Sequence, residues 1–152
     1  MCGIALFCYT DESKSKIEEW MKNCEFELRK RGQEDLFQIH SIKIFDLNLS
    51  FLGSVLAMRK TTKQPIVNEN GILLFNGEIF DSPFEIKEDE NDVQVLSREL
   101  QKCSDHSEIE KLLKSIKGPQ SFIYFSFGLN TLFFGKSFFG QRVREKSIFS
   151  SF

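Results

Sequence analysis

The residue with the clearest chemical potential is a cysteine directly after the initiator methionine. Cys2 stands in the sequence Met-Cys-Gly-Ile, ahead of an apolar run that ends near Tyr9. If Met1 is removed, one residue carries both a thiol, with an ordinary pKa of about 8.5, and an α-amine, with a pKa of about 7.7–8.0. The neutral amine could then take the thiol proton, so this nucleophile would need no histidine. The alternative interpretation is a small buried residue at the start of a strand.

The other cysteines and the histidines indicate no second reactive centre. Cys8, Cys24 and Cys103 form no Cys-x-x-Cys pair, and the two histidines are His40 and His106. These spacings favour neither a zinc site nor a Cys–His dyad, and we expect no metal and no other cofactor. The first segment has no basic start typical of an export signal, so we expect reduced cysteines and a cytoplasmic protein.

Size and charge restrict the function further. At 152 residues the chain has the length of one domain, and its 17 phenylalanines can fill a thick core. The net charge is −2, so no positive field is available to bind nucleic acid or an anionic membrane. The sequence contains no apolar run of about 18 residues, so we expect no transmembrane helix.

The apolar pattern predicts three helices. The first spans Glu12–Arg31, the second begins at Asn91 or Asp92, and the third begins at a capping box, Ser107-x-x-Glu110, and is stopped by Gly118-Pro119. In the first helix the residues expected on one apolar face are Ile17, Trp20, Met21, Cys24 and Leu28.

The remaining apolar stretches predict strands and two hairpins. Asn76-Gly77 separates two short stretches and is a strong hairpin signal, and Gly128-Leu129-Asn130 indicates a second hairpin. Strands grouped apart from helices favour an α+β fold with two mostly antiparallel sheets packed together and helices outside. The predicted strands are 2–9, 42–47, 50–58, 71–75, 78–80, 122–127 and 131–135.

Seven short stretches occur in an order that resembles a known family. They are MCGI (1–4), RKRG (29–32), Arg59 with Gln64-Pro65, FNGEIF (75–80), ENDVQVL (90–96), GPQSFIYF (118–125) and FFGKSFFG (133–140). Together they resemble the N-terminal glutaminase domain of class II glutamine amidotransferases, in the branch that includes asparagine synthetase. The resemblance implies an N-terminal-nucleophile hydrolase-like, four-layer αββα sandwich. It covers residues 1–140 as the amidotransferase domain and leaves 141–152 as a divergent C-terminal tail.

The resemblance implies three catalytic residues. The Cys2 thiolate would attack the side-chain amide of L-glutamine, giving a thioester and ammonia before water releases glutamate. The Asn76 side-chain NH₂ and the Gly77 backbone N–H would stabilise the oxyanion that forms. The alternative for Asn76-Gly77 is a plain hairpin turn.

The resemblance also implies a pocket for the amino-acid end of L-glutamine. Arg59 matches the arginine that binds the α-carboxylate, Asp92 matches the carboxylate that binds the α-ammonium group, and Glu78 would line the same pocket. The alternatives are a surface charge at a strand end for Arg59 and a helix cap for Asp92.

This sequence departs most from the family pattern at its C-terminal end. Past the glycine that matches Gly140, family members continue into further strands and an ATP-dependent synthetase domain. The stretch QRVREKSIFSSF of this chain matches neither. We therefore expect a sandwich that could lack its last strands, and an ammonia-accepting synthetase domain or protein acting in trans. The alternative to an active glutaminase is a catalytically weak or inactive glutamine-binding or interaction module.

Overall fold

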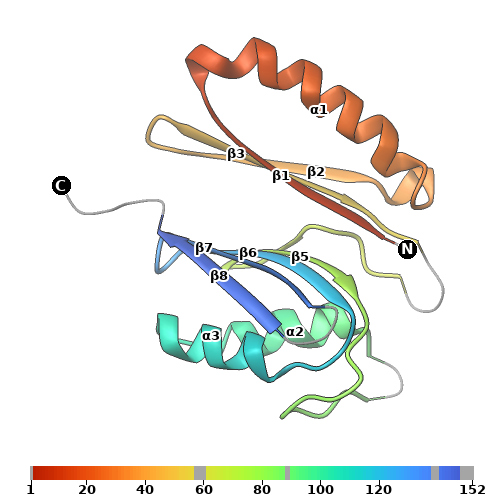
Figure 1. Ribbon diagram of the computed structural model, residues 1–152, viewed down its shortest axis with the longest axis vertical. Helices are drawn as coiled ribbons and strands as arrows, with labels where there is room; N and C mark the ends of the chain where they lie inside the picture. Colours follow the sequence, from red (N-terminus) through yellow and green to blue (C-terminus); the bar gives the residue numbers. More distant parts are fainter. Residues whose placement is uncertain (1, 57–60, 88–89, 138–140, 148–152) are drawn as a thin grey trace. The chain divides into compact units, whose positions relative to one another are not determined.

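The computed structural model describes residues 2–56, 61–87, 90–137 and 141–147. The chain divides into two compact units, Met1–Pro65 and Ile66–Phe152. Each unit contains one antiparallel sheet with its helices on one face (Figure 1). The protein is therefore α+β with two antiparallel sheets, as the sequence predicts.

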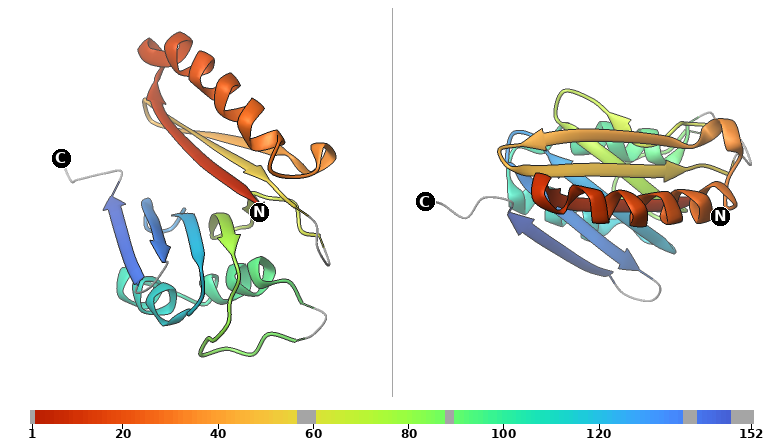
Figure 2. Two further views of the ribbon diagram at one scale, coloured as in Figure 1. Left: turned by 45° about the vertical axis from the view of Figure 1, so that its right-hand side comes forward. Right: turned by 90° about the horizontal axis from the view of Figure 1, so that it is seen from above.

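The first unit contains a three-stranded sheet in the order β1-β3-β2. The strands are β1 (Gly3–Thr10), β2 (Gln38–Ile44) and β3 (Leu47–Ser54), and β3 pairs antiparallel with both neighbours. Helix α1 (Lys14–Arg29) follows a single 3₁₀ turn, η1 (Asp11–Ser13), and a second such turn, η2 (Glu34–Leu36), precedes β2. Figure 2 shows α1 lying along this sheet, nearly parallel to its strands.

The contact between α1 and the sheet is narrower than the sequence pattern predicts. Leu28 is buried and lies so close to β1 that a Cβ atom placed on Gly3 would be 2.5 Å from Leu28 Cδ2. Trp20, which was expected on the apolar face, is instead 52% exposed, and the Lys16 ammonium lies 5.3 Å from its ring centroid. Trp20 lies at the margin of the apolar stripe, where a cation–π contact and solvent compete with packing.

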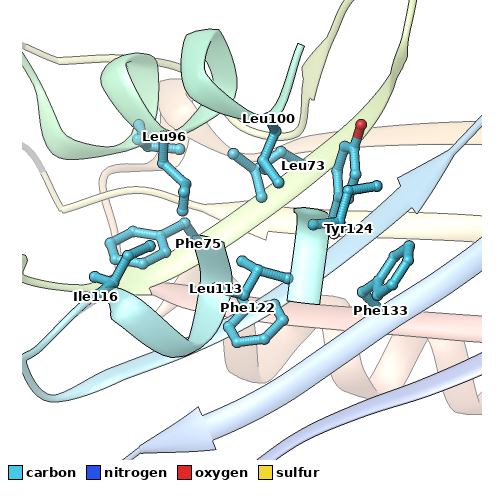
Figure 3. Packing of buried hydrophobic residues seen from close by; sticks show 11 residues of the cluster. Leu73, Phe75, Leu96, Leu100, Leu113, Ile116, Phe122, Tyr124 and Phe133 are labelled. Carbon is cyan, nitrogen blue, oxygen red and sulfur yellow. The ribbon is translucent and has the colours of Figure 1, made fainter. Parts of the chain in front are cut away.

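The second unit contains a five-stranded sheet in the order β4-β5-β6-β7-β8, antiparallel throughout. Helices α2 (Asp92–Leu100) and α3 (His106–Ser115) cover one face of this sheet (Figures 1 and 2). Figure 3 shows leucines of both helices directed at the aromatic side chains of the sheet. The strands are β4 (Ile66–Val67), β5 (Gly71–Gly77), β6 (Gln120–Ser126), β7 (Thr131–Ser137) and β8 (Gln141–Ser147).

The core of the second unit lies between these helices and this sheet. Burial of large side chains from both helices is the main source of stability for such a layer pair, at about 25 cal/mol per Å² of apolar surface. The buried residues of this cluster are Leu73, Phe75, Val93, Leu96, Leu100, Ile109, Leu113, Ile116, Phe122, Tyr124 and Phe133.

Side-chain caps fix the starts of the two helices. At α2 the Asn91 side chain accepts a hydrogen bond from Val93 N–H, which decides between the two predicted starts. At α3 the cap is Asp105, which accepts from Glu108 N–H at 2.9 Å, while Glu108 accepts from Ser104 N–H at 2.7 Å. The predicted cap at Ser107 is therefore wrong by two residues: Asp105 caps the helix, and Glu108 accepts from the residue before the cap and not from the cap itself.

One of the two predicted hairpins is confirmed. β6 and β7 pair antiparallel across the turn that contains Gly128-Leu129-Asn130. Asn76-Gly77 does not form a hairpin: both residues lie inside β5 and pair with Ser121 and Gln120 of β6, and the stretch 78–80 is not a strand. The dipeptide gives a local signal, but the pairing of β5 with a strand more than 40 residues away overrides it.

The C-terminal stretch adds a strand to the second sheet. β8 (Gln141–Ser147) pairs with β7, although the sequence pattern indicated only a divergent tail there. The assignment of residues 1–140 to an amidotransferase domain stays a prediction. Over the part of the chain that the structure covers, no helix has the length and apolar character needed to cross a membrane.

Candidate functional site

Cys2 lies immediately before β1, in the first unit. Its Sγ is 3.4 Å from the Leu56 backbone nitrogen, which donates a hydrogen bond to it, and the residue is partly buried. Gly3 faces Leu28 of α1. Because successive residues of an extended chain alternate between faces, Cys2 lies on the face of the sheet that α1 does not cover.

The chain after α1 packs tightly against the strand that leads to Leu56. A Cβ atom placed on Gly32 would lie 2.4 Å from Ser54 Oγ and 2.7 Å from Val55 O. Gln33 N–H donates to Val55 O at 3.0 Å. Glycine is therefore required at position 32, because any side chain would push this loop away from the end of β3, next to the Cys2 contact.

Arg59, the predicted ligand of the α-carboxylate, lies outside the residues that the structure describes. The neighbouring Gln64-Pro65 is described and packs against β3: a Cβ atom placed on Gly53 would lie 2.6 Å from Gln64 O. The role predicted for Arg59 stays a prediction.

In the second unit, the backbone of β5 directs the Gly77 amide away from β6. Glu78 N–H donates to Pro119 O at 3.2 Å and Phe80 N–H donates to Lys117 O at 2.8 Å. In an antiparallel pair only every second residue bonds to a given neighbour, so Gly77 and Ile79 present their N–H groups to the other edge of β5. Within the described residues of this unit, β4 occupies that edge only at Ile72 and Leu73. The Gly77 amide therefore lies at an edge of β5 that no described strand pairs with at this position.

The Asn76 side chain lies beside this amide. Phe75 points into the helix-covered core (Figure 3), so Asn76, the next residue along the strand, points to the opposite face. Asn76 is partly buried, and none of the side-chain hydrogen bonds among the described residues involves it. Two donors, one from a side chain and one from the backbone, are thus adjacent and available at the end of β5.

Asp92 lies at the same edge of β5. Its Oδ2 accepts a hydrogen bond from Ile79 N–H at 2.8 Å, and Asn91, not Asp92, is the cap of α2. The helix-cap interpretation of Asp92 is therefore wrong. Glu78, the remaining residue of this group, is exposed. In the second unit, Asn76, Gly77 and Glu78 follow one another at the end of β5, and Asp92 is joined to the next residue, Ile79. Their roles in binding and catalysis stay predictions.

Two glycines allow the close backbone approach that this arrangement requires. A Cβ atom placed on Gly77 would lie 2.3 Å from Pro119 O, and one placed on Gly118 would lie 2.0 Å from Glu78 O. Gly118 also has a φ of 145°, which L-residues rarely adopt. The sequence analysis treated Gly118-Pro119 as a helix stop and as part of the family stretch GPQSFIYF (118–125); a Gly-Pro pair directly before a strand is the signal that could have indicated this role.

Burial and an ion pair shift the pKa values of three groups outside the candidate site. Burial raises the pKa values of the Cys24 and Cys103 thiols, so these cysteines are held neutral. The hydrogen bond from Lys117 lowers the pKa of Asp81, at the end of the segment that follows Glu78. Among the residues with described positions, no three His, Cys, Asp or Glu side chains gather closely enough to hold a metal ion.

The fold and the geometry together define an α+β protein in which two adjacent amide donors lie at the end of one strand, with a carboxylate near them. No model of a protein family matches the chain. The chain is similar to asparagine synthetase domain-containing protein 1 of Gallus gallus, at 34% identity over 145 residues, and of Homo sapiens, at 35% identity over 145 residues. The matched residues are 93% of this chain but only 23% and 22% of those relatives. The chain therefore spans less than a quarter of the length of these proteins, and the similarity supports a relationship to the asparagine synthetase branch.

Proposed function

We propose that this chain is a class II glutamine amidotransferase domain that hydrolyses L-glutamine to glutamate and ammonia. The observation that carries the proposal is the pair of available donors at the end of β5, the Asn76 side chain and the Gly77 N–H. An amide that becomes tetrahedral needs two such donors for its oxyanion. The similarity to proteins named after asparagine synthetase adds support, because the synthesis of asparagine uses nitrogen from an amide.

The proposed reaction begins with removal of Met1, which leaves Cys2 with a free α-amine. The amine takes the thiol proton, and the sulfur attacks the side-chain carbonyl carbon of glutamine. The resulting oxyanion accepts hydrogen bonds from Asn76 and Gly77. As the C–N bond breaks, the ammonium group of Cys2 returns the proton, and ammonia leaves a thioester on sulfur.

Water completes the reaction. The α-amine of Cys2 takes a proton from water as its oxygen attacks the thioester carbon, and a second oxyanion forms at the same two donors. The C–S bond then breaks, and glutamate leaves with the thiol restored.

The substrate pocket follows from charge. The Asp92 carboxylate would hold the α-ammonium group of glutamine, Arg59 would hold its α-carboxylate, and Glu78 would line the pocket. We further propose that the ammonia passes to a synthetase-type domain or protein, and that the reaction takes place in the cytoplasm.

The test compares Cys2, directly before β1, with Cys8, inside β1. Cys2→Ala should abolish glutamate release from L-glutamine, whereas Cys8→Ala, at an exposed cysteine of β1, should retain it. A chloroketone analogue of glutamine should label Cys2 and spare Cys8, and the intact mass should show that Met1 is lost. Unchanged glutamate release by Cys2→Ala, or retention of Met1 in active protein, would contradict the proposal.

A further inference from the structure

The segment that follows Gly77 is fixed at every amide. Glu78, Phe80 and Asp81 donate their N–H groups to backbone carbonyls of residues 117–119 at 2.8–3.4 Å. The amide of Ile79 points to the other edge of the strand and donates to Asp92 Oδ2 at 2.8 Å. Of these four amides, only that of Ile79 is bound by a side chain. The Asp92 carboxylate therefore takes the place that a neighbouring strand would occupy.

The position of Asp92 is itself fixed by the core. The Asn91 side chain caps the helix by accepting from Val93 N–H at 3.0 Å. Val93 is 3% exposed and Leu96 is fully buried, both in the cluster that contains Phe75 of β5. The helix start and the strand are thus packed on one core, and Asp92 joins them a second time at the strand edge.

We propose that Asp92 is a positioning residue, which holds Ile79 and thereby keeps the Gly77 amide directed at the open edge of β5. A carboxylate that accepts from a backbone N–H forms a stronger bond than a neutral acceptor. Because Oδ2 binds Ile79, and Oδ1 has no hydrogen bond to a described residue, one oxygen serves the backbone and the other is free for a ligand. The catalytic consequence rests on the proposed glutaminase function, but the backbone role does not.

The experiment separates the charge of Asp92 from its hydrogen bond. Asp92→Asn retains an oxygen that can accept from Ile79 N–H, whereas Asp92→Ala removes it. Amide hydrogen exchange of Ile79, measured by NMR, should speed up about tenfold in Asp92→Ala and less than about threefold in Asp92→Asn. Asn91→Ala is the matched control, because it removes the cap of the same helix and leaves Asp92 in place. Its effect at Ile79 should be smaller than that of Asp92→Ala.

Glutamine hydrolysis gives the second readout. Asp92→Asn should raise KM for L-glutamine with kcat largely kept, and Asp92→Ala should lower kcat as well, because the Gly77 donor is then no longer held in place. Equal kcat in the two variants would overturn the link to Gly77.

The two proposals fail in different ways. If the parent protein does not hydrolyse glutamine, the proposed function is wrong, and hydrogen exchange still decides the role of Asp92. Unchanged exchange of Ile79 in Asp92→Ala, or an equal effect of Asn91→Ala, would overturn the positioning role. Should Asp92→Ala fail to fold, Asp92→Ser, which keeps a polar helix start with a shorter side chain, provides the same comparison.

Discussion

The two units hold their candidate site residues in opposite ways. In the first unit, the one hydrogen bond of Cys2 Sγ to a described residue comes from Leu56 N–H at 3.4 Å. In the second unit, the strand end at Asn76-Gly77 is followed by a segment whose amides are all engaged, and it rests on a core shared with two helices. The difference teaches that strand pairing and core packing hold the candidate donors of the second unit in place, which is the preorganisation that the proposed oxyanion stabilisation would require.

The helices of the two units also differ in how much of their surface is buried. α1 buries only Leu28 and leaves Trp20 and Phe26 more than half exposed, with lysine ammonium groups over both rings. α2 buries four apolar side chains and α3 buries Ile109 and Leu113, and Figure 3 shows Leu96, Leu100 and Leu113 in the core. Stability should therefore depend more on the packing of the second unit than on α1, and the comparison of Leu113→Ala with Trp20→Ala tests this.

The largest effect is expected at the backbone crossing behind the strand end. Gly118→Ala would place a Cβ atom 2.0 Å from Glu78 O at a φ of 145°. Strain and overpacking together should lower the free energy of unfolding by about 4 kcal/mol. Gly128→Ala is the matched control, because its Cβ atom would meet nothing within 4 Å, and it should change stability by less than about 0.5 kcal/mol. Urea denaturation measures both; equal stability of the two variants would show that the crossing is not tight.

The helix comparison should give the next largest effect. Leu113→Ala on α3 removes a fully buried side chain and should cost about 3 kcal/mol. Trp20→Ala on α1 removes a larger side chain, but one that is 52% exposed, and should cost less than about 1 kcal/mol. If Trp20→Ala destabilised the protein as much as Leu113→Ala, the contrast between the two helix layers would be wrong.

The smallest effect is expected from the exposed ion pair of Asp81 and Lys117. Lys117 lowers the pKa of Asp81 below its usual 3.8, so the contribution of the pair is complete above that value and is lost as the pH falls through the lowered pKa. Asp81 in turn raises the pKa of Lys117 above its usual 10.5, so the contribution is also lost as the pH rises through that raised value. The difference in urea midpoint between the parent and Asp81→Asn should be small and constant from about pH 5 to 9, and should vanish in acid. A difference that persisted at about pH 2 would have another origin.

Much of this arrangement is predictable from local sequence signals. The fold class, the helix at Asp92–Leu100 and the hairpin around Gly128 follow from apolar spacing and turn residues, which act over a few positions. No local signal brings Asp92 to the segment after β5, where it binds Ile79 N–H; only the ordered family motifs assigned Asn76, Gly77 and Asp92 to one site, and that assignment stays a prediction. The prediction of a hairpin at Asn76-Gly77 was wrong, because the same dipeptide also suits a strand end at which another backbone segment approaches closely.

Other features depend on contacts that no local pattern reveals. Trp20 has helical spacing with Leu28, yet its exposure depends on how wide a surface the sheet offers to α1. The hydrogen bond between Ile79 N–H and Asp92 joins residues 13 positions apart and is visible only once α2 packs against β5. The sequence Gln141–Ser147 has the composition of a polar tail and lacks the apolar pattern of a strand. It is a strand because its backbone pairs with β7.

The double attachment of residues 78–81 has a consequence for variation in chain length. Asp81 is paired with Lys117 and Asn91 caps α2, so the stretch between Ser82 and Glu90 begins and ends at anchored points. The entropy of closing such a loop grows only slowly with its length. Insertions and deletions should therefore accumulate between these anchors during evolution, while the spacing from Asn76 to Asp81 tolerates none.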